Sequence, residues 1–124
     1  MKEIKVTQAP AAVGPYSQGI ATDSLIFLSG QLGIDPATNK MAETVEEQAE
    51  LSLKNIAALL EDQGKTFADV VKTTVLLADI KDFAAVNEIY SQYFTEPFPA
   101  RSAFAVKDLP LGGLVEIECI VANH

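Results

Sequence analysis

Hydrophobic and polar positions alternate with a period that changes along the chain, and the changes predict its elements. Leu25 to Leu28 form an apolar run closed by Ser29-Gly30-Gln31, and Gly19 to Thr22 precede it across a short polar turn. This arrangement predicts a β-hairpin whose second strand ends at Ser29 and Gly30. The run Val70 to Leu77 is β-branched and largely apolar, which is typical of a strand buried on both faces.

Two segments carry the period of an amphipathic helix. The first begins at a capping box, Thr44 to Glu47, and ends at Gly64, and its apolar face is formed by Ala49, Leu53, Ile56 and Leu60. The second is ended by Pro97 and Pro99, and its apolar face is formed by Phe83, Val86, Tyr90 and Tyr93.

Two final strands are expected near Ala100 to Val106 and Leu114 to Ala122, on either side of the loop Leu109 to Gly113. The element order predicts an α/β (α+β) sandwich in which two helices cover one face of a single mixed sheet. No repeat, low-complexity tract or linker interrupts the chain, so residues 1–124 are expected to form one domain.

Two helices leave the other face of such a sheet uncovered. Because the strands are so apolar, we expect this face to be buried against copies of itself in a symmetric oligomer, with clefts between the subunits. The alternative is a monomer whose second face is only modestly apolar, and the strand composition favours it less.

Composition narrows the class of protein. A chain of 124 residues with 48% hydrophobic and 21% charged residues is neither disordered nor collagenous, and it can bury a core without disulfides. Cys119 is the only cysteine, which indicates a reducing compartment. The segment Met1 to Lys5 has no apolar run for secretion, and no stretch has membrane length, so a cytoplasmic protein is expected.

Charge and residue types narrow the chemistry. A net charge of −8 with lysines scattered singly from Lys2 to Lys107 disfavours nucleic-acid binding. The only histidine is His124, so triads built on histidine are excluded, and no zinc or calcium pattern is present. Gly112-Gly113 lacks the spacing of a phosphate-binding loop. We therefore expect no metal or cofactor, and a site made of carboxylates, arginine, hydroxyls and backbone amides.

Arg101 is the only arginine, and it lies in the largely apolar segment Pro97 to Phe104. In such surroundings a guanidinium offers a fixed fork of donors to a carboxylate. It could equally pair with a structural carboxylate or extend to water. The residues alone leave these alternatives open.

Glu116 and Glu118 alternate with Val115, Ile117 and Cys119, so both carboxylates share one strand face and Cys119 faces the core. Neighbouring like charges on a partly apolar face raise a carboxyl pKa toward the range of a general acid or base. Alternating strands are often simply half exposed, however, and on the residues alone we favour that solvated alternative.

Four further positions are candidates, each with a structural alternative. Tyr16 lies on a loop among turn formers, where its phenol could reach a ligand or only pack. The hydroxyl of Ser29 and the backbone amides of Ser29 and Gly30 could contact a ligand, or the two residues could simply form the turn that ends the strand. Asn87 lies beside core Val86 on the second helix and could bind a ligand or cap locally.

The chain resembles the RidA (YjgF-like) family in six segments that follow in the family's order. These are Ala9 to Gly19, Leu28 to Gly33, Lys72 to Val75, Phe83 to Tyr90, Phe98 to Ser102 and Val115 to Glu118. The resemblance implies a chorismate-mutase-like fold and a homotrimer with three clefts between subunits. It also implies hydrolysis, without a cofactor, of the 2-iminobutanoate and 2-iminopropanoate (enamine/imine) intermediates that PLP-dependent dehydratases release. The products are 2-keto acids and ammonia.

The resemblance also implies roles for named residues. Arg101 would bind the substrate carboxylate and Glu116 would activate water and move protons. The cleft would be lined by Tyr16, Ser29 and Asn87, with backbone amides at Gly30 and Ala103. Glu118 does not match the catalytic position of the family and is expected to be structural.

Two points qualify the resemblance. Many similar sequences carry cysteine where this chain has Ala103, so regulation through a thiol is lost there. Members of the family have also been described as translation inhibitors and ribonucleases, which the acidic charge disfavours. A protein of the same fold that binds 2-keto acids without turnover is the main alternative.

Overall fold

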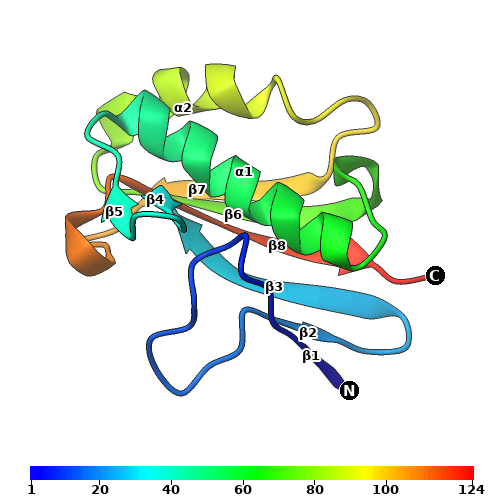
Figure 1. Ribbon diagram of the computed structural model, residues 1–124. Coiled ribbons are helices and arrows are strands. Elements are labelled where there is room, and N and C mark those ends of the chain that lie inside the picture. The colour runs from blue at the N-terminus through cyan, green and yellow to red at the C-terminus, as the bar shows by residue number, and fades with distance from the viewer.

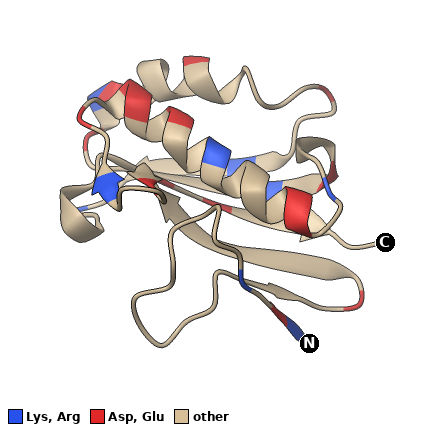
Figure 2. Ribbon diagram, viewed as in Figure 1, with Lys and Arg blue, Asp and Glu red and all other residues tan.

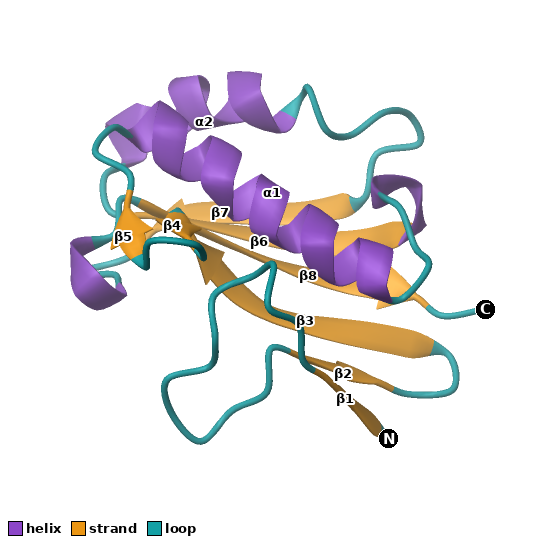
Figure 3. Cartoon of the chain, viewed as in Figure 1, coloured by secondary structure: helices purple, strands orange, loops and turns teal.

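A computed structural model describes residues 1–124. Six strands form one mixed sheet in the order β1-β2-β3-β8-β6-β7. Their bounds are β1 Lys2–Ile4, β2 Gly19–Ala21, β3 Leu25–Leu32, β6 Val70–Leu77, β7 Ala100–Ala105 and β8 Val115–Ala122. The helices α1, Val45–Asp62, and α2, Phe83–Tyr90, lie on the same face of the sheet (Figures 1 and 3). The predicted sheet with two helices on one face is therefore confirmed.

Helix α1 begins and ends as its sequence predicts. The hydroxyl of Thr44 accepts a hydrogen bond from the Glu47 amide at 3.1 Å, and the Glu47 carboxylate accepts one from the Thr44 amide at 3.3 Å. This capping box satisfies two amides that the first helical turn leaves free. Gly64, at φ +68°, reverses the chain after the helix. The predicted apolar face is buried throughout: Ala49, Leu53, Ile56 and Leu60.

The β2–β3 hairpin is confirmed, but the predicted end of its second strand is wrong. Strand β3 continues to Leu32, and its pairing with β8 shifts register between Leu28 and Gln31. Ser29 and Gly30 therefore form a bulge inside the strand. A bulge frees backbone groups from the ladder without ending the strand, which explains why a turn-like composition was misleading here.

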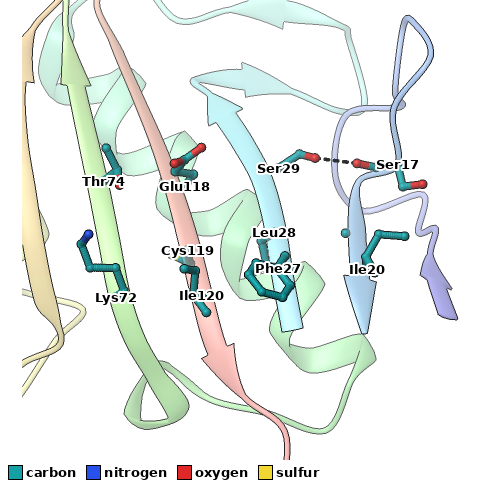
Figure 4. Close-up of a pocket in the computed structure, with 11 residues that line it drawn as sticks. Ser17, Ile20, Phe27, Leu28, Ser29, Lys72, Thr74, Glu118, Cys119 and Ile120 are labelled. Carbon is teal, nitrogen blue, oxygen red and sulfur yellow. Dashed lines mark hydrogen bonds between the residues drawn. The ribbon is translucent and has the colours of Figure 1, made fainter. Parts of the chain in front are cut away.

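The prediction that Val70 to Leu77 is buried on both faces is also wrong for the single chain. Thr73, Val75 and Leu77 are buried beneath the helices, whereas Val71 is 45% exposed and Lys72 is half-buried. Both helices pack on one face, so the alternate residues of β6 are left on the open face, part of which is drawn in Figure 4.

Helix α2 is shorter than predicted, because it ends at Tyr90 and not at the prolines. The chain continues through turns in which Phe94 stacks on Tyr90 with ring centroids 4.3 Å apart. Aromatic packing, and not helical continuation, therefore places Tyr93 and Phe94 against the core.

Three short strands were not predicted: β1 and the separate hairpin of β4, Ile34–Asp35, and β5, Lys40–Met41. Strands of two or three residues are too short to show a hydrophobic period. The final strands β7 and β8 agree with prediction to within one residue at each end.

A row of buried polar side chains on α1 fixes the end of β3 and the start of β8. Ser52 donates to the carbonyl of Gln31 at 2.6 Å, and Asn55 donates to the carbonyl of Ile34 at 2.9 Å. The Gln48 side chain accepts from the amide of Leu114 at 2.8 Å. These bonds satisfy backbone groups near the bulge.

No helix combines the length and apolar character needed to cross a bilayer. The acidic and basic residues are spread along the ribbon, and in the view of Figure 2 the lysines do not gather into one patch.

Candidate functional site

The predicted site residues fall into two groups on opposite faces of the sheet. Glu116 lies on the open face, since its strand neighbours Val115 and Ile117 are buried beneath the helices. Arg101 lies on the helix face, where it contacts Asn87 of α2. Within one chain, the sheet therefore separates the two residues that the resemblance assigns to catalysis.

Glu116 sits in a pocket of about 590 Å³ between the β3 bulge, the loop before β2 and the loop before β8. Partial burial raises the pKa of its carboxyl, and the negative charge of Glu118 raises it further. Glu118 itself is exposed. Glu118 therefore lies on a solvated surface, whereas Glu116 is half-buried and its pKa is shifted upward, the direction in which a carboxyl takes up a proton more readily.

Gly30 packs directly against the carboxyl of Glu116. A Cβ atom at position 30 would lie 2.8 Å from Cδ and 3.1 Å from Oε2 of Glu116. Only glycine leaves room for the carboxyl in its observed place. Gly30 lies at the register shift of the β3–β8 pairing and lines the pocket.

A Gly30→Ala variant is expected to lose up to about 100-fold in turnover if Glu116 is the base, because the added Cβ would displace its carboxyl and a misplacement of about 1 Å can cost that much. The measurement is the turnover rate with the substrate that the family resemblance implies, together with the thermal unfolding midpoint. Gly64→Ala is the control, because it strains a residue at φ +68° with no atom near its Cβ. The control is expected to lower stability and keep the rate. Wild-type turnover by Gly30→Ala would contradict the prediction.

Tyr16 and Ser29 line the same pocket as Glu116. The Tyr16 hydroxyl accepts from the Val13 amide at 3.4 Å, so its own proton is free for a ligand. Ser29 donates its hydroxyl proton to the carbonyl of Ser17 at 2.5 Å, so toward the pocket it can only accept. The tyrosine thus offers a donor and the serine an acceptor beside one carboxyl.

The second group surrounds Arg101. Its guanidinium donates to Oδ1 of Asn87 at 2.6 Å and lies 4.9 Å from the ring centroid of Tyr90 and 5.4 Å from that of Phe83. Of the two ion pairs in the chain, neither includes Arg101, so no carboxylate of the chain lies within 4.0 Å of it. Within the single chain, Arg101 thus has no carboxylate partner, and its side chain is exposed, as the alternative of extension to water expects.

Arg101 and Asn87 line a surface pocket of about 320 Å³ together with Tyr90, Phe98 and Pro99. Stacking and the bond from Asn87 hold the guanidinium while its remaining donors stay free. A carboxylate or a phosphate matches the planar geometry of this fork. Ala103, two residues along the same edge strand β7, is half-buried opposite Val75.

Two other sequence expectations concern metals and the thiol. No group of three or more side chains is arranged to hold a metal ion. Cys119 faces the core as predicted, and burial raises the pKa of its thiol to about 12.

The sequence did not predict most of the residues that line the Glu116 pocket, and two of them are Gln18 and Leu111. Gln18 is buried beside it, and Leu111 lines it in a left-handed conformation at φ 57°. A leucine between Pro110 and Gly112 gave no signal of that conformation. Gln18 directly precedes the strand that begins at Gly19. A glutamine at such a position is either exposed or, if buried, fully hydrogen-bonded, so the sequence could have marked Gln18 as a possible structural tie.

Comparisons with known proteins place the chain among related sequences. The family model described as Endoribonuclease L-PSP matches residues 6–123. The 2-iminobutanoate/2-iminopropanoate deaminase of Capra hircus is 53% identical over 121 residues, covering 97% of this chain and 88% of the relative. The chloroplastic Reactive Intermediate Deaminase A of Arabidopsis thaliana is also 53% identical over 121 residues. The match covers 96% of this chain and 65% of that longer relative.

Solved structures agree with the fold. Escherichia coli TdcF with bound serine is 39% identical, covers 100% of both chains and has a TM-score of 0.95. The YjgF gene product of Escherichia coli is 42% identical, also covers 100% of both chains and has a TM-score of 0.95.

Proposed function

Because this chain belongs to the Endoribonuclease L-PSP family, with RidA deaminases among its relatives, we propose that it is a 2-iminobutanoate/2-iminopropanoate deaminase. It hydrolyses these imines to 2-keto acids and ammonia. The observation that carries the proposal is the half-buried Glu116, with its raised pKa, in a pocket that also offers a hydroxyl donor and a hydroxyl acceptor. The expected location is cytoplasmic, as the single buried cysteine favours.

The reaction uses one substrate, one water and one base. The guanidinium of Arg101 binds the substrate carboxylate, assisted by Asn87. The Glu116 carboxylate takes a proton from water, whose oxygen forms a bond to the imine carbon. As this bond forms, the C=N π bond opens and nitrogen takes that proton, which gives a carbinolamine. The proton of the carbinolamine hydroxyl then passes through Glu116 to nitrogen, the C=O bond forms, the carbon–nitrogen bond breaks, and ammonia and the 2-keto acid are released. Tyr16 donates to the ligand, Ser29 accepts from it, and the amides of Gly30 and Ala103 complete the contacts. No step requires a metal or a cofactor.

The proposal includes a homotrimer with a shared cleft at each of its three interfaces. It is supported by the separation of Arg101 and Glu116 on opposite faces of one sheet, since a neighbouring copy could bring them together. It is also supported by the apolar side chains of the open face, where Phe27 and Phe104 are exposed in the single chain.

The serine bound to the related TdcF structure is a small molecule with a carboxylate, which fits the free guanidinium of Arg101. RNA cleavage, which the family description names, is the less favoured function here. A net charge of −8 repels a phosphate backbone, and the lysines are scattered singly along the sequence.

The test generates the imine in situ with a serine/threonine dehydratase and follows ammonia and 2-keto acid with and without this protein. Faster release is the expected result. An unchanged rate, with 2-oxobutanoate still raising the unfolding midpoint, would replace the enzyme by a binding protein. Cleavage of a labelled RNA would support the ribonuclease alternative. Sedimentation equilibrium is expected to give three times the 13.3 kDa mass of the chain.

A further inference from the structure

The loop that carries Tyr16 is held at one end by the side chain of Gln18. Gln18 is only 4% exposed. Its amide nitrogen donates to the carbonyls of Pro10 at 2.8 Å, Val6 at 3.1 Å and Ala9 at 3.3 Å. Its amide oxygen accepts from the amide of Val6 at 2.6 Å. One side chain thus joins the start of the loop, residues 6–10, to its end.

A second tie fixes the end of this loop to the β3 bulge. The amide of Ser29 donates to the carbonyl of Gln18 at 2.9 Å, and the hydroxyl of Ser29 donates to the carbonyl of Ser17 at 2.5 Å, as Figure 4 shows. Residue 30, next along the bulge, contacts the carboxyl of Glu116. The loop end and the Glu116 pocket therefore share one support.

Between these two ties, the middle of the loop has no buried side chain, although Ala9 at its start is 2% exposed. Residues 11–16 are all exposed, and Tyr16 itself is 51% exposed. The bonds of Tyr16 are local: its amide donates to Gly14 and its hydroxyl accepts from Val13. An exposed segment of this kind takes its position from its anchored ends.

We propose that Gln18 is a positioning residue for the hydrolysis, because it holds the loop so that the Tyr16 hydroxyl stays over the Glu116 pocket. The inference rests on the proposed function and extends it. Gln18 contacts backbone groups of its own chain only and takes no part in proton transfer. Its action on the reaction passes through Tyr16.

The first variant is Gln18→Met, which keeps the length of the side chain and removes all four hydrogen bonds. The turnover rate is expected to fall about tenfold, as for a catalytic group displaced by about 1 Å. Binding of 2-oxobutanoate by Arg101 is expected to change less than about threefold, since the Arg101 pocket shares no residue with the loop.

A double variant separates positioning from a general structural role. If Gln18 acts through the Tyr16 hydroxyl, Tyr16→Phe with Gln18→Met is expected to be no slower than the slower single variant. If the double variant is slower than wild type by the product of the two single-variant rate losses, the effects are independent and the proposal is overturned. Thr44→Ala, which removes the α1 cap, is the stability control: its unfolding midpoint is expected to fall while its turnover stays at the wild-type rate.

Gln18→Glu gives a second readout. The ionised carboxylate of this variant would have no proton to donate to the carbonyls of Val6, Ala9 and Pro10, whereas the protonated carboxyl could donate one hydrogen bond to them. At pH values above the acid limb of the wild-type profile, where Glu116 stays ionised, the rate of this variant relative to wild type is therefore expected to rise as pH falls. A ratio independent of pH would count against the proposal.

The outcomes also separate this inference from the proposed function. If wild type shows no turnover, the proposed function fails, and hydrogen exchange of residues 9–16 in Gln18→Met still reports whether Gln18 holds the loop. If wild type is active and Gln18→Met matches it, the function stands and the positioning role is overturned.

Discussion

A Glu116→Gln variant is expected to hydrolyse 2-iminobutanoate about 100- to 10,000-fold more slowly than wild type, the range that general acid–base groups contribute. Glutamine keeps the size and hydrogen-bonding of the side chain but cannot take a proton from water. The measurement is keto-acid release from imine generated in situ. Binding of 2-oxobutanoate is expected to persist, because Arg101 is unchanged.

The pH dependence tests the same carboxyl. A raised pKa means that Glu116 is protonated at a higher pH than an ordinary glutamate, so activity falls on acidification earlier than for an unperturbed carboxyl. Glu118→Gln removes a like charge and lowers the pKa of Glu116. The acid limb is then expected to move to lower pH, with near wild-type turnover at neutral pH. An unmoved limb, or an active Glu116→Gln, would contradict the assignment.

An Arg101→Ala variant is expected to have a kcat/KM about a hundredfold or more below that of wild type. Removing one partner of a charge-assisted contact costs about 3 kcal/mol, which corresponds to about that factor. In contrast to Glu116→Gln, this variant is expected to lose the rise in unfolding midpoint that 2-oxobutanoate causes in wild type.

Arg101→Lys is the informative companion. It keeps the positive charge but loses the planar fork that Asn87 and the Tyr90 ring hold in place. Intermediate binding and turnover are expected. Lys107→Ala, an exposed cation beyond the end of β7, is the control for charge alone and is expected to behave as wild type. Equal loss in both alanine variants would show that net charge, and not the fork, matters.

The proposed homotrimer, with a cleft shared between neighbouring copies, makes one joint prediction for the Glu116→Gln and Arg101→Ala variants. If each cleft takes Arg101 from one copy and Glu116 from its neighbour, every mixed trimer of the two variants contains one intact cleft. Unfolding and refolding them together is then expected to restore about a quarter of the wild-type activity. No recovery in mixed trimers would place both residues of each cleft in one chain.

The local structure that the sequence predicts well is the structure that short-range physics determines. The capping box at Thr44 satisfies amides three residues away, and the apolar face from Ala49 to Leu60 repeats at helical spacing. Likewise, alternation in β8 correctly placed Cys119 in the core and Glu116 on the other face.

What the sequence could not predict depends on partners far along the chain. Ser29 and Gly30 read as a turn because the bulge exists only against β8. The burial of Glu116 requires Gly30 of another strand, and the hydrogen bonds of Gln18 require a carbonyl at Val6. The placement of Arg101 and Glu116 on opposite faces follows from their pairing with β6, where Arg101 is opposite the buried Thr73 and Glu116 is opposite Leu76.

The place of β8 in the sheet has a consequence for how the protein is made. This strand lies between β3 and β6, yet it is the last of the six to be synthesised. Until it leaves the ribosome, β3 and β6 lack their common neighbour and present open apolar edges to other chains. The nascent protein is therefore most prone to aggregate just before the segment bearing its proposed catalytic glutamate emerges.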